Sequence, residues 1–231
     1  MGFAKGNNVA IKFALKQGAD YVFLLNNDTI LEKDLIERLI KVARTNNKIG
    51  IVGPKILDIR NQSLVHEVGM TCDIFGFPIA VRQQESGKQT ISEVFYVSGC
   101  AMLIKQEVLN KAGLFDEEYF MFAENYDLHN RLLKHGFKIG HVESKEIHTD
   151  EPRSLLDNAK KHYYYGKTVK RFLDVNPEKG IKQISPIRPA FIRNWKNFAK
   201  HPLLAIGFFI YQIVRYSAAG LGFLSSLGET I

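Results

Sequence analysis

The chain has 231 residues, of which 45% are hydrophobic, and it contains 16 Phe and 9 Tyr. This composition excludes an intrinsically disordered chain and is sufficient for one α/β domain with an appendage. With 31 Lys and Arg against 24 Asp and Glu, the formal net charge of +7 indicates an anionic partner, whether a nucleotide, a phospholipid surface or a nucleic acid.

The opening part of the chain predicts alternating helices and strands. Apolar residues at helical spacing begin at Val9 and stop at Gly18, and the apolar run YVFLL at 21–25 predicts a buried strand. An amphipathic stripe over 32–46 predicts a second helix, and IGIVGPKIL at 49–57 predicts a second strand. Helix, strand, helix and strand in this order indicate part of a doubly wound, mostly parallel α/β sheet.

The middle of the chain is polar and glycine-containing over 58–93, where we expect an irregular or hairpin excursion over the carboxyl edge of the sheet. Regular structure then returns. The predicted elements are two strand-like runs within 93–104 that flank Ser98 and Gly99, helices over 106–111 and 124–135, and a strand over 137–142.

The C-terminal part predicts a basic, tyrosine-rich helix over 154–173, a proline-containing linker and an apolar stretch over 203–224. That stretch is long enough to cross a bilayer, but Gln212 and Arg215 lie near its middle, so we expect a helix in the membrane interface. The alternative is packing on the domain or on a second copy in a homodimer. The expected division is into residues 1–152 and a helical extension, residues 153–231.

Cysteine usage and the N-terminal sequence both indicate a cytoplasmic chain. Cys72 and Cys100 have no metal-binding spacing, which predicts two buried thiols in a reducing compartment. Residues 1–16 are interrupted by Gly, Asn and Lys and lack the apolar core of a secretory signal.

Polar residues end the strand predicted at 21–25, where Asn26, Asn27 and Asp28 follow the apolar run. A carboxylate at the carboxyl edge of a parallel sheet is well placed to bind a metal or ligand. The same residues also favour turns and helix caps for local hydrogen-bonding reasons, so both interpretations remain open.

A second candidate segment lies at 113–139, where carboxylates alternate with aromatic residues. A carboxylate among apolar groups is desolvated, which suits it to act as a general base, and Glu124 and Asp127 are the candidates. Helical spacing offers an alternative for each, because Asp127 and Arg131 can form an ion pair and Glu124 can complement the helix dipole.

Four segments together resemble the successive motifs of family 2 glycosyltransferases of the GT-A fold, especially their rhamnosyltransferase-like members. The segments are GFAKGNN at 2–8, YVFLLNNDT at 21–29, VSGCAMLIKQEVLNKAGLFDEEYF at 97–120 and AENYDLHNRLLKHGFKI at 123–139. They occur in the family's order over roughly residues 2–150, so the resemblance is far more specific than any one motif.

The resemblance implies a role for each matching residue. Asp28 corresponds to the aspartate that binds Mg²⁺ or Mn²⁺ at the donor diphosphate. His148 corresponds to a histidine often found near the diphosphate and is a candidate second metal ligand. The residues implied in donor binding are Gly6, Asn8, Asn26, Asn27 and Gly99. Either Glu124 or Asp127 takes the place of the catalytic base, or the protein is slow or inactive.

Two departures from the family pattern accompany these matches. Asn125 stands where the family's usual catalytic aspartate is expected, and an amide cannot accept a proton at neutral pH. The family's N-terminal nucleotide-binding portion has no counterpart in the sequence, so we expect a partial, N-terminally truncated GT-A domain.

The sequence therefore predicts a membrane-associated, metal-dependent inverting glycosyltransferase that works at the cytoplasmic face of the membrane in cell-surface polysaccharide or glycoconjugate synthesis. Its expected substrates are a nucleotide-sugar donor and a glycan or polyprenyl-linked acceptor. The alternative function is that of an inactive remnant that serves as a binding module. The Lys- and Tyr-rich stretch at 160–171 suggests a nucleic-acid binder, but a lipid surface explains it better beside the apolar tail.

Overall fold

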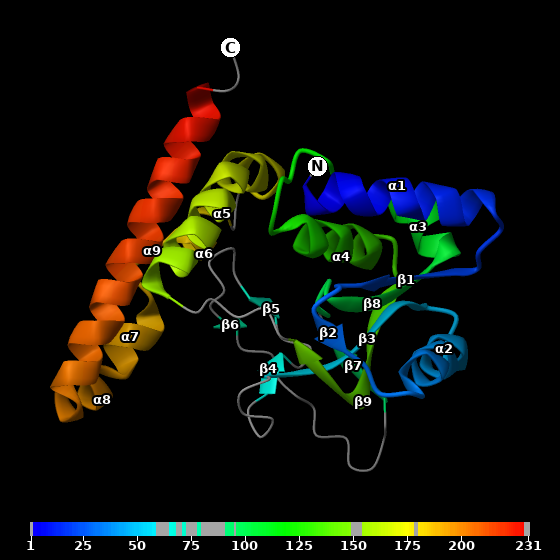
Figure 1. Cartoon of the computed structure of the whole chain (residues 1–231), viewed down its shortest axis with the longest axis horizontal. Coiled ribbons are helices and arrows are strands. Elements are labelled where there is room, and N and C mark those ends of the chain that lie inside the picture. The colour runs from blue at the N-terminus through cyan, green and yellow to red at the C-terminus, as the bar shows by residue number, and fades with distance from the viewer. Residues whose placement is uncertain are drawn as a thin grey trace. The chain divides into compact units, whose positions relative to one another are not determined.

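A computed structural model describes residues 2–58, 65–67, 71–72, 78–79, 91–94, 96–148, 154–177 and 180–228. The chain divides into two compact units, and Figure 1 shows the elements of both. The first unit comprises residues 1–72, 78–117 and 123–151, and the second comprises residues 73–77, 118–122 and 152–231.

The first unit alternates helices and strands as the sequence predicts. Its helices are α1 (Phe3–Lys16), α2 (Leu35–Thr45), α3 (Gln106–Ala112) and α4 (Glu124–Lys134). Its strands are β1 (Tyr21–Leu25), β2 (Thr29–Ile30), β3 (Ile49–Asp58), β4 (Val65–Glu67), β5 (Thr71–Cys72), β6 (Pro78–Ile79), β7 (Ile91–Val94), β8 (Ala101–Lys105) and β9 (Lys138–His148).

The main sheet has the strand order β1-β8-β3-β9-β2, with β4 paired to β3 and β7 paired to β9. The α/β class is confirmed, but the expectation of a mostly parallel sheet is wrong. β1, β3 and β9 run in one direction, as strands joined through helices should, yet β8 inserts antiparallel between β1 and β3. Among the described strands, only β3 and β9 pair in parallel.

Helices cover both faces of this sheet, with α1, α3 and α4 on one side and α2 on the other (Figure 1). The side chains of β8 alternate between the two cores: Met102 and Ile104 face the first group of helices, whereas Leu103 faces α2. In α4, Leu128 and Leu132 are fully buried. This double covering explains why the central strands are apolar on both faces.

The excursion predicted at 58–93 falls mostly outside the described residues, including the segment 83–90. Its described parts are short. β5 and β6 pair antiparallel with each other, and β4 pairs antiparallel with β3. Cys100 is a buried free thiol, as expected, whereas the Cys72 side chain is not among those described.

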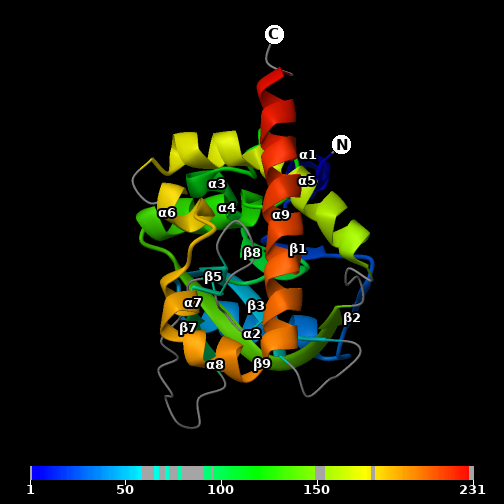
Figure 2. The same cartoon turned by 90° about the vertical axis from the view of Figure 1, so that its left-hand side faces the viewer.

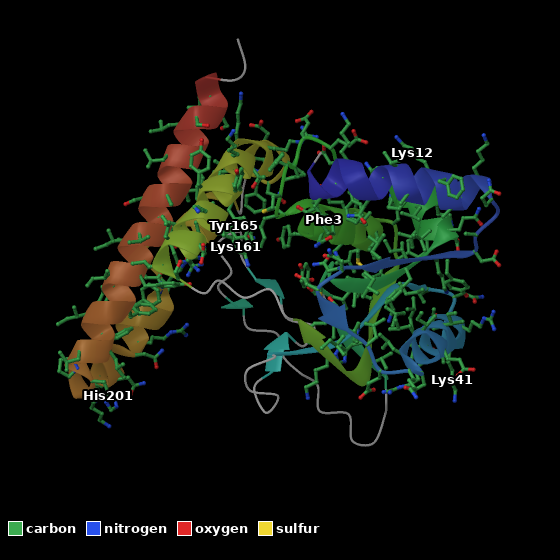
Figure 3. All side chains as sticks on the ribbon, in the orientation of Figure 1. Phe3, Lys12, Lys41, Lys161, Tyr165 and His201 are labelled. Carbon is green, nitrogen blue, oxygen red and sulfur yellow. The ribbon has the colours of Figure 1, made fainter. Side chains whose placement is uncertain are left out.

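The second unit is helical. It contains α5 (Leu155–Val175), α6 (Gly180–Ile184), α7 (Pro189–Arg193), α8 (Trp195–Lys200) and α9 (Pro202–Gly228). Ser154 caps α5 by accepting a hydrogen bond from the Asp157 amide at 3.1 Å. On α5, the Lys161 ammonium lies 5.9 Å from the Tyr165 ring centroid, and both side chains are labelled in Figure 3.

α5 and α9 cross at very close range, and Figure 2 shows α9 running across α5. Two glycines make this approach possible. A Cβ atom on Gly166 would lie 1.9 Å from the Ala219 carbonyl oxygen, and one on Gly222 would lie 1.9 Å from the Tyr163 carbonyl oxygen. Larger residues at either position would push the two backbones apart.

Polar side chains line the crossing of α5 and α9. Arg215 donates from Nε to His162 Nε2 at 2.7 Å and from Nη1 to Gln212 Oε1 at 3.4 Å. Asn158 donates to the Tyr211 hydroxyl at 2.9 Å. The two polar residues in the middle of the apolar stretch are therefore buried against α5, which compensates the cost of removing them from water.

Candidate functional site

The turn after β1 is tied to the start of β8. The Asn26 amide donates to the Cys100 carbonyl at 2.8 Å, and the Thr29 amide donates to the Asn26 carbonyl at 3.3 Å. Asn26 to Thr29 therefore form a turn, as one of the two interpretations proposed. Asp28 is half-buried within it, at the carboxyl end of β1, where the ligand interpretation also requires it.

Gly99 brings a third segment to the same edge. A Cβ atom on Gly99 would lie 2.2 Å from Asn125 Nδ2 and 2.8 Å from Asn125 Cγ, so Asn125 packs directly on the glycine backbone. Because Leu25 of β1 pairs with Ala101 of β8, the turns at 26–29 and 98–100 are neighbours. Three segments distant in sequence thus meet at this edge.

Glu124 is the first residue of α4 and is 4% exposed. The chain enters this helix through two consecutive residues with positive φ angles, Phe122 at 74° and Ala123 at 73°. Each costs about 1 kcal/mol or more for a residue with a side chain, and such strain concentrates at functional sites. The backbone therefore holds the carboxylate in a fixed place at the helix N-terminus.

Asp127 is engaged elsewhere. Arg131 Nε donates to Asp127 Oδ2 at 2.8 Å, and Arg131 also donates to the carbonyl oxygens of Ala112 and, at 2.7 Å, of Leu114. The predicted Asp127–Arg131 pair exists, but it is largely buried and fastens α4 to the end of α3. This geometry disfavours the expectation that Asp127 acts as a base, because its charge is already paired.

Asn8 also has a structural role. Its amide donates to the Phe115 carbonyl at 2.8 Å and to Glu117 Oε1 at 3.0 Å, and its oxygen accepts from the Phe115 amide at 3.1 Å. Phe3, labelled in Figure 3, packs edge to face on Phe115 with ring centroids 5.8 Å apart. The Asn8 side chain is buried and committed to these partners, so it does not favour donor binding. Gly6 lies exposed on the same helix.

His129 is a residue that the sequence analysis did not select. It is buried, its Nδ1 contacts the Asn125 carbonyl, and its Nε2 accepts a hydrogen bond from the Val97 amide at 3.5 Å. Burial lowers the pKa of His129 to about 4, so the ring is neutral near pH 7. The sequence offered one signal for His129: it is a polar residue next to Leu128 on the predicted helix.

His148 lies in β9 and pairs with Thr29, the residue that follows Asp28. Its side chain is not among those described, so its expected ligand role remains a prediction. Within the described part of the chain, no three His, Cys, Asp or Glu side chains gather into a metal-binding cluster. In the turn after β1 the described carboxylate is that of Asp28, which suits an ion that takes its other oxygen ligands from water or a bound molecule.

The family model for "Glycosyltransferase like family 2" matches residues 2–163. The chain belongs to glycosyltransferase-like family 2. The membership predicted from the four motifs is therefore confirmed, and the convergence of Asp28, Gly99 and Glu124 lies within the matched region.

Curated relatives of this family 2 chain include three transferases. It is 24% identical over 177 residues to the low-salt glycan biosynthesis hexosyltransferase Agl10 of Haloferax volcanii, covering 76% of this chain and 57% of the relative. It is 28% identical over 141 residues to the N-acetylglucosaminyl-diphospho-decaprenol L-rhamnosyltransferase of Mycobacterium tuberculosis, covering 55% and 46%. For the rhamnosyltransferase WbbL of Escherichia coli, the identity is 24% over 152 residues, covering 61% and 58%.

The chain thus spans about half the length of the curated relatives it matches. Among solved structures, the crystal structure of GalNAc-T7 with UDP, GalNAc and Mn²⁺ superposes with a TM-score of 0.54 at 16% identity. The superposition covers 75% of this chain and 35% of that one. This likeness confirms the predicted GT-A fold of the family 2 chain.

Proposed function

We propose that this chain carries the sugar-transfer site of a metal-dependent, inverting glycosyltransferase. The supporting observation is that three separate segments meet at the carboxyl end of β1. The turn that carries Asp28 is hydrogen-bonded through Asn26 to Cys100, next to Gly99, and Asn125, next to Glu124, packs on Gly99. The donor is a nucleotide sugar, as expected for a family 2 chain. Asn26, Asn27 and Gly99 line its side of the site, because they belong to the two adjacent turns.

Asp28, with His148 beside it in the strand register, would hold a Mg²⁺ or Mn²⁺ ion. The bound ion supplies Lewis-acid stabilisation of the charge that develops on the departing nucleoside diphosphate. Asp28 is suited to this because it is half-buried at the end of a rigid strand, and the turn hydrogen bond at Thr29 fixes its backbone. A divalent ion held by one or two protein ligands and phosphate oxygens needs no larger cluster.

Glu124 would accept the proton from the acceptor hydroxyl. Its carboxylate is buried at the N-terminus of α4, and Asp127 is paired with Arg131, so Glu124 is the better candidate of the two. Attack by the activated hydroxyl opposite the leaving group inverts the anomeric centre of the sugar. A positioned general base typically contributes about 10²- to 10⁴-fold to such a step.

The acceptor is proposed to be a glycan or a polyprenyl-linked saccharide used in polysaccharide or glycoconjugate synthesis. The printed names of the relatives support this class: one acts on N-acetylglucosaminyl-diphospho-decaprenol, and another in glycan biosynthesis. An acceptor of this kind resides at a membrane, so a membrane-seated enzyme would meet it directly.

The second unit carries a surface suited to an anionic membrane. α9 exposes a row of large apolar side chains: Leu203, Leu204, Ile206, Phe209, Ile210, Ile213, Leu221 and Leu224. Residues 179–228 contain seven Lys or Arg and no Asp or Glu, and Arg193, Lys196 and Lys200 are exposed near the start of α9. Apolar side chains beside uncompensated positive charge favour binding to anionic lipid.

Among the described helices, α9 alone is long and apolar enough to cross a bilayer. Packing against α5 favours a position in the interface instead. Arg215 is bonded to His162 of α5, and α5 exposes Lys160, Lys161 and Lys170 to solvent. A spanning α9 would draw these lysines into hydrocarbon, at about 2.5 kcal/mol or more for each. We therefore propose that the protein binds peripherally to a membrane surface rather than spanning the bilayer.

Calorimetry of sugar-nucleotide binding tests the assignment of residues. Asp28→Ala is expected to abolish the part of donor binding that depends on Mn²⁺ or Mg²⁺, whereas Glu124→Gln should retain binding but lose transfer. Asp20→Ala, at the opposite end of β1 and exposed, is the matched control. Undiminished metal-dependent binding by Asp28→Ala would count against the proposal.

A further inference from the structure

His129 joins two of the three segments that form the candidate site. Its Nδ1 contacts the carbonyl oxygen of Asn125, in the first turn of α4, and its Nε2 accepts from the amide of Val97, which precedes Ser98 and Gly99. The ring of Tyr96 lies 4.9 Å from the His129 ring, measured between centroids. One imidazole thus connects the loop before β8 with the N-terminus of α4.

The two contacts define how the imidazole is protonated. A carbonyl oxygen only accepts and a backbone amide only donates, so Nδ1 must carry the hydrogen and Nε2 must be bare. Burial keeps the ring neutral, in keeping with its lowered pKa of about 4. A protonated ring would lose the hydrogen bond from Val97, because both ring nitrogens would then be donors.

The second link between the same segments is the contact of Gly99 with Asn125. That contact requires that the loop and the helix keep a fixed separation, since Asn125 packs on the bare backbone of Gly99. Glu124 immediately precedes Asn125, so any movement of the start of α4 relative to the loop changes the distance between Glu124 and Gly99. Displacements of about 1 Å can cost about 10²-fold in rate.

We propose that His129 is a positioning residue for sugar transfer. It holds Val97 and Asn125 together, so that the distance between Glu124 and the turn that contains Gly99 stays fixed. The effect on catalysis rests on the proposed function, whereas the two contacts of His129 with Val97 and Asn125 do not depend on it. Its role differs from that of Asp28, which would act on the donor. Loss of His129 should therefore lower kcat by more than it weakens donor binding.

The experiment compares three variants of the full chain. His129→Phe keeps an aromatic ring beside Tyr96 but removes both polar contacts, and His129→Asn retains a donor in the position of Nδ1. Val42→Ala truncates a buried side chain of α2 on the opposite face of the sheet and controls for loss of stability alone. Amide hydrogen exchange is measured over 96–100 and 124–127, together with nucleoside diphosphate release.

The expected result for His129→Phe is faster exchange in both segments and a kcat lower by about 10- to 100-fold, a larger factor than any rise in the donor KM. His129→Asn should restore protection over 124–127 and part of kcat, and Val42→Ala should alter neither. Unchanged exchange in His129→Phe, or an equal loss of kcat in Val42→Ala, would overturn the proposal. If the unaltered protein released no nucleoside diphosphate, the proposed function would fail, and hydrogen exchange would still decide the linkage.

Discussion

Asn125 packs directly on Gly99, with its Nδ2 only 2.2 Å from where a Cβ atom on residue 99 would be. No larger residue fits at 99 unless Asn125 moves. The glycine and the amide are therefore one structural feature, although they lie on different segments. Asn125 replaces the aspartate expected from the resemblance, and its contact with Gly99 shows that the side chain at this position packs against the turn at 98–100.

Gly99→Ala is expected to displace Asn125 and to lower both stability and transfer. Forcing a methyl group into this contact should cost about 1–3 kcal/mol in the free energy of unfolding, measured by urea denaturation. The double variant Gly99→Ala/Asn125→Ala removes the clash, so its loss should be smaller than the sum of the single losses. Gly207→Ala, which has nothing within 4 Å of the added Cβ, is the control. Additive losses would contradict the contact.

Arg131→Met is expected to destabilise the first unit strongly, since it leaves the buried Asp127 carboxylate without its charged partner. Breaking such a pair costs about 3 kcal/mol, which denaturant titration would measure. Asp127→Asn keeps a polar group of the same shape and should retain transfer activity in the folded protein. Complete loss of transfer in folded Asp127→Asn would instead return Asp127 to the role of base.

Stability is expected to fall as the pH drops from about 6.5 toward 4. His129 has its pKa lowered from 6.5 to about 4 by burial, so in this window the unfolded chain binds the proton and the folded chain does not. The full effect is about 3 kcal/mol, lost as the pH falls through the window. Denaturant titrations at several pH values should show this dependence reduced in His129→Phe. It should persist in His135→Gln, which changes an exposed histidine at the end of α4.

Binding to vesicles that contain anionic lipid is expected to depend on the basic residues before α9. Replacing Arg193, Lys196 and Lys200 by Gln should weaken binding by about 1 kcal/mol for each residue. Added salt should also weaken binding, because it screens the charges. Co-sedimentation with vesicles measures this. The matched control replaces three exposed lysines of the first unit: Lys5, Lys41 and Lys134. Equal weakening in both triple variants would contradict a specific surface.

Much of the fold follows from local patterns. Gly18 adopts a positive φ angle at the helix end that the sequence predicts, and α4 begins at the predicted Glu124. The apolar spacing that begins at Val9 predicts the helix α1 but not its buried face, because Val9 and Phe13 are 59% and 67% exposed. The buried face is set instead by Ala4, Asn8 and Ile11, and Asn8 is fixed by bonds to Phe115, more than one hundred residues away.

For the candidate site too, local sequence patterns predict single residues but not the contacts between distant segments. The sequence identified Asp28, Gly99 and Glu124, because each follows or begins a predictable element. It missed the insertion of β8 between β1 and β3, which depends on pairing between distant strands. It also missed the linkage through His129 and the burial of Asp127 with Arg131. Those contacts depend on how α4 packs, which local periodicity does not encode.

Release of nucleoside diphosphate from a sugar nucleotide, followed with a lipid-linked acceptor in Mg²⁺ or Mn²⁺, tests the central claim most directly. The account predicts release that stops with a chelator and with Asp28→Asn, and that persists in Asp20→Asn at the other end of the same strand. Metal-dependent release by Asp28→Asn at the rate of the unaltered protein would contradict it.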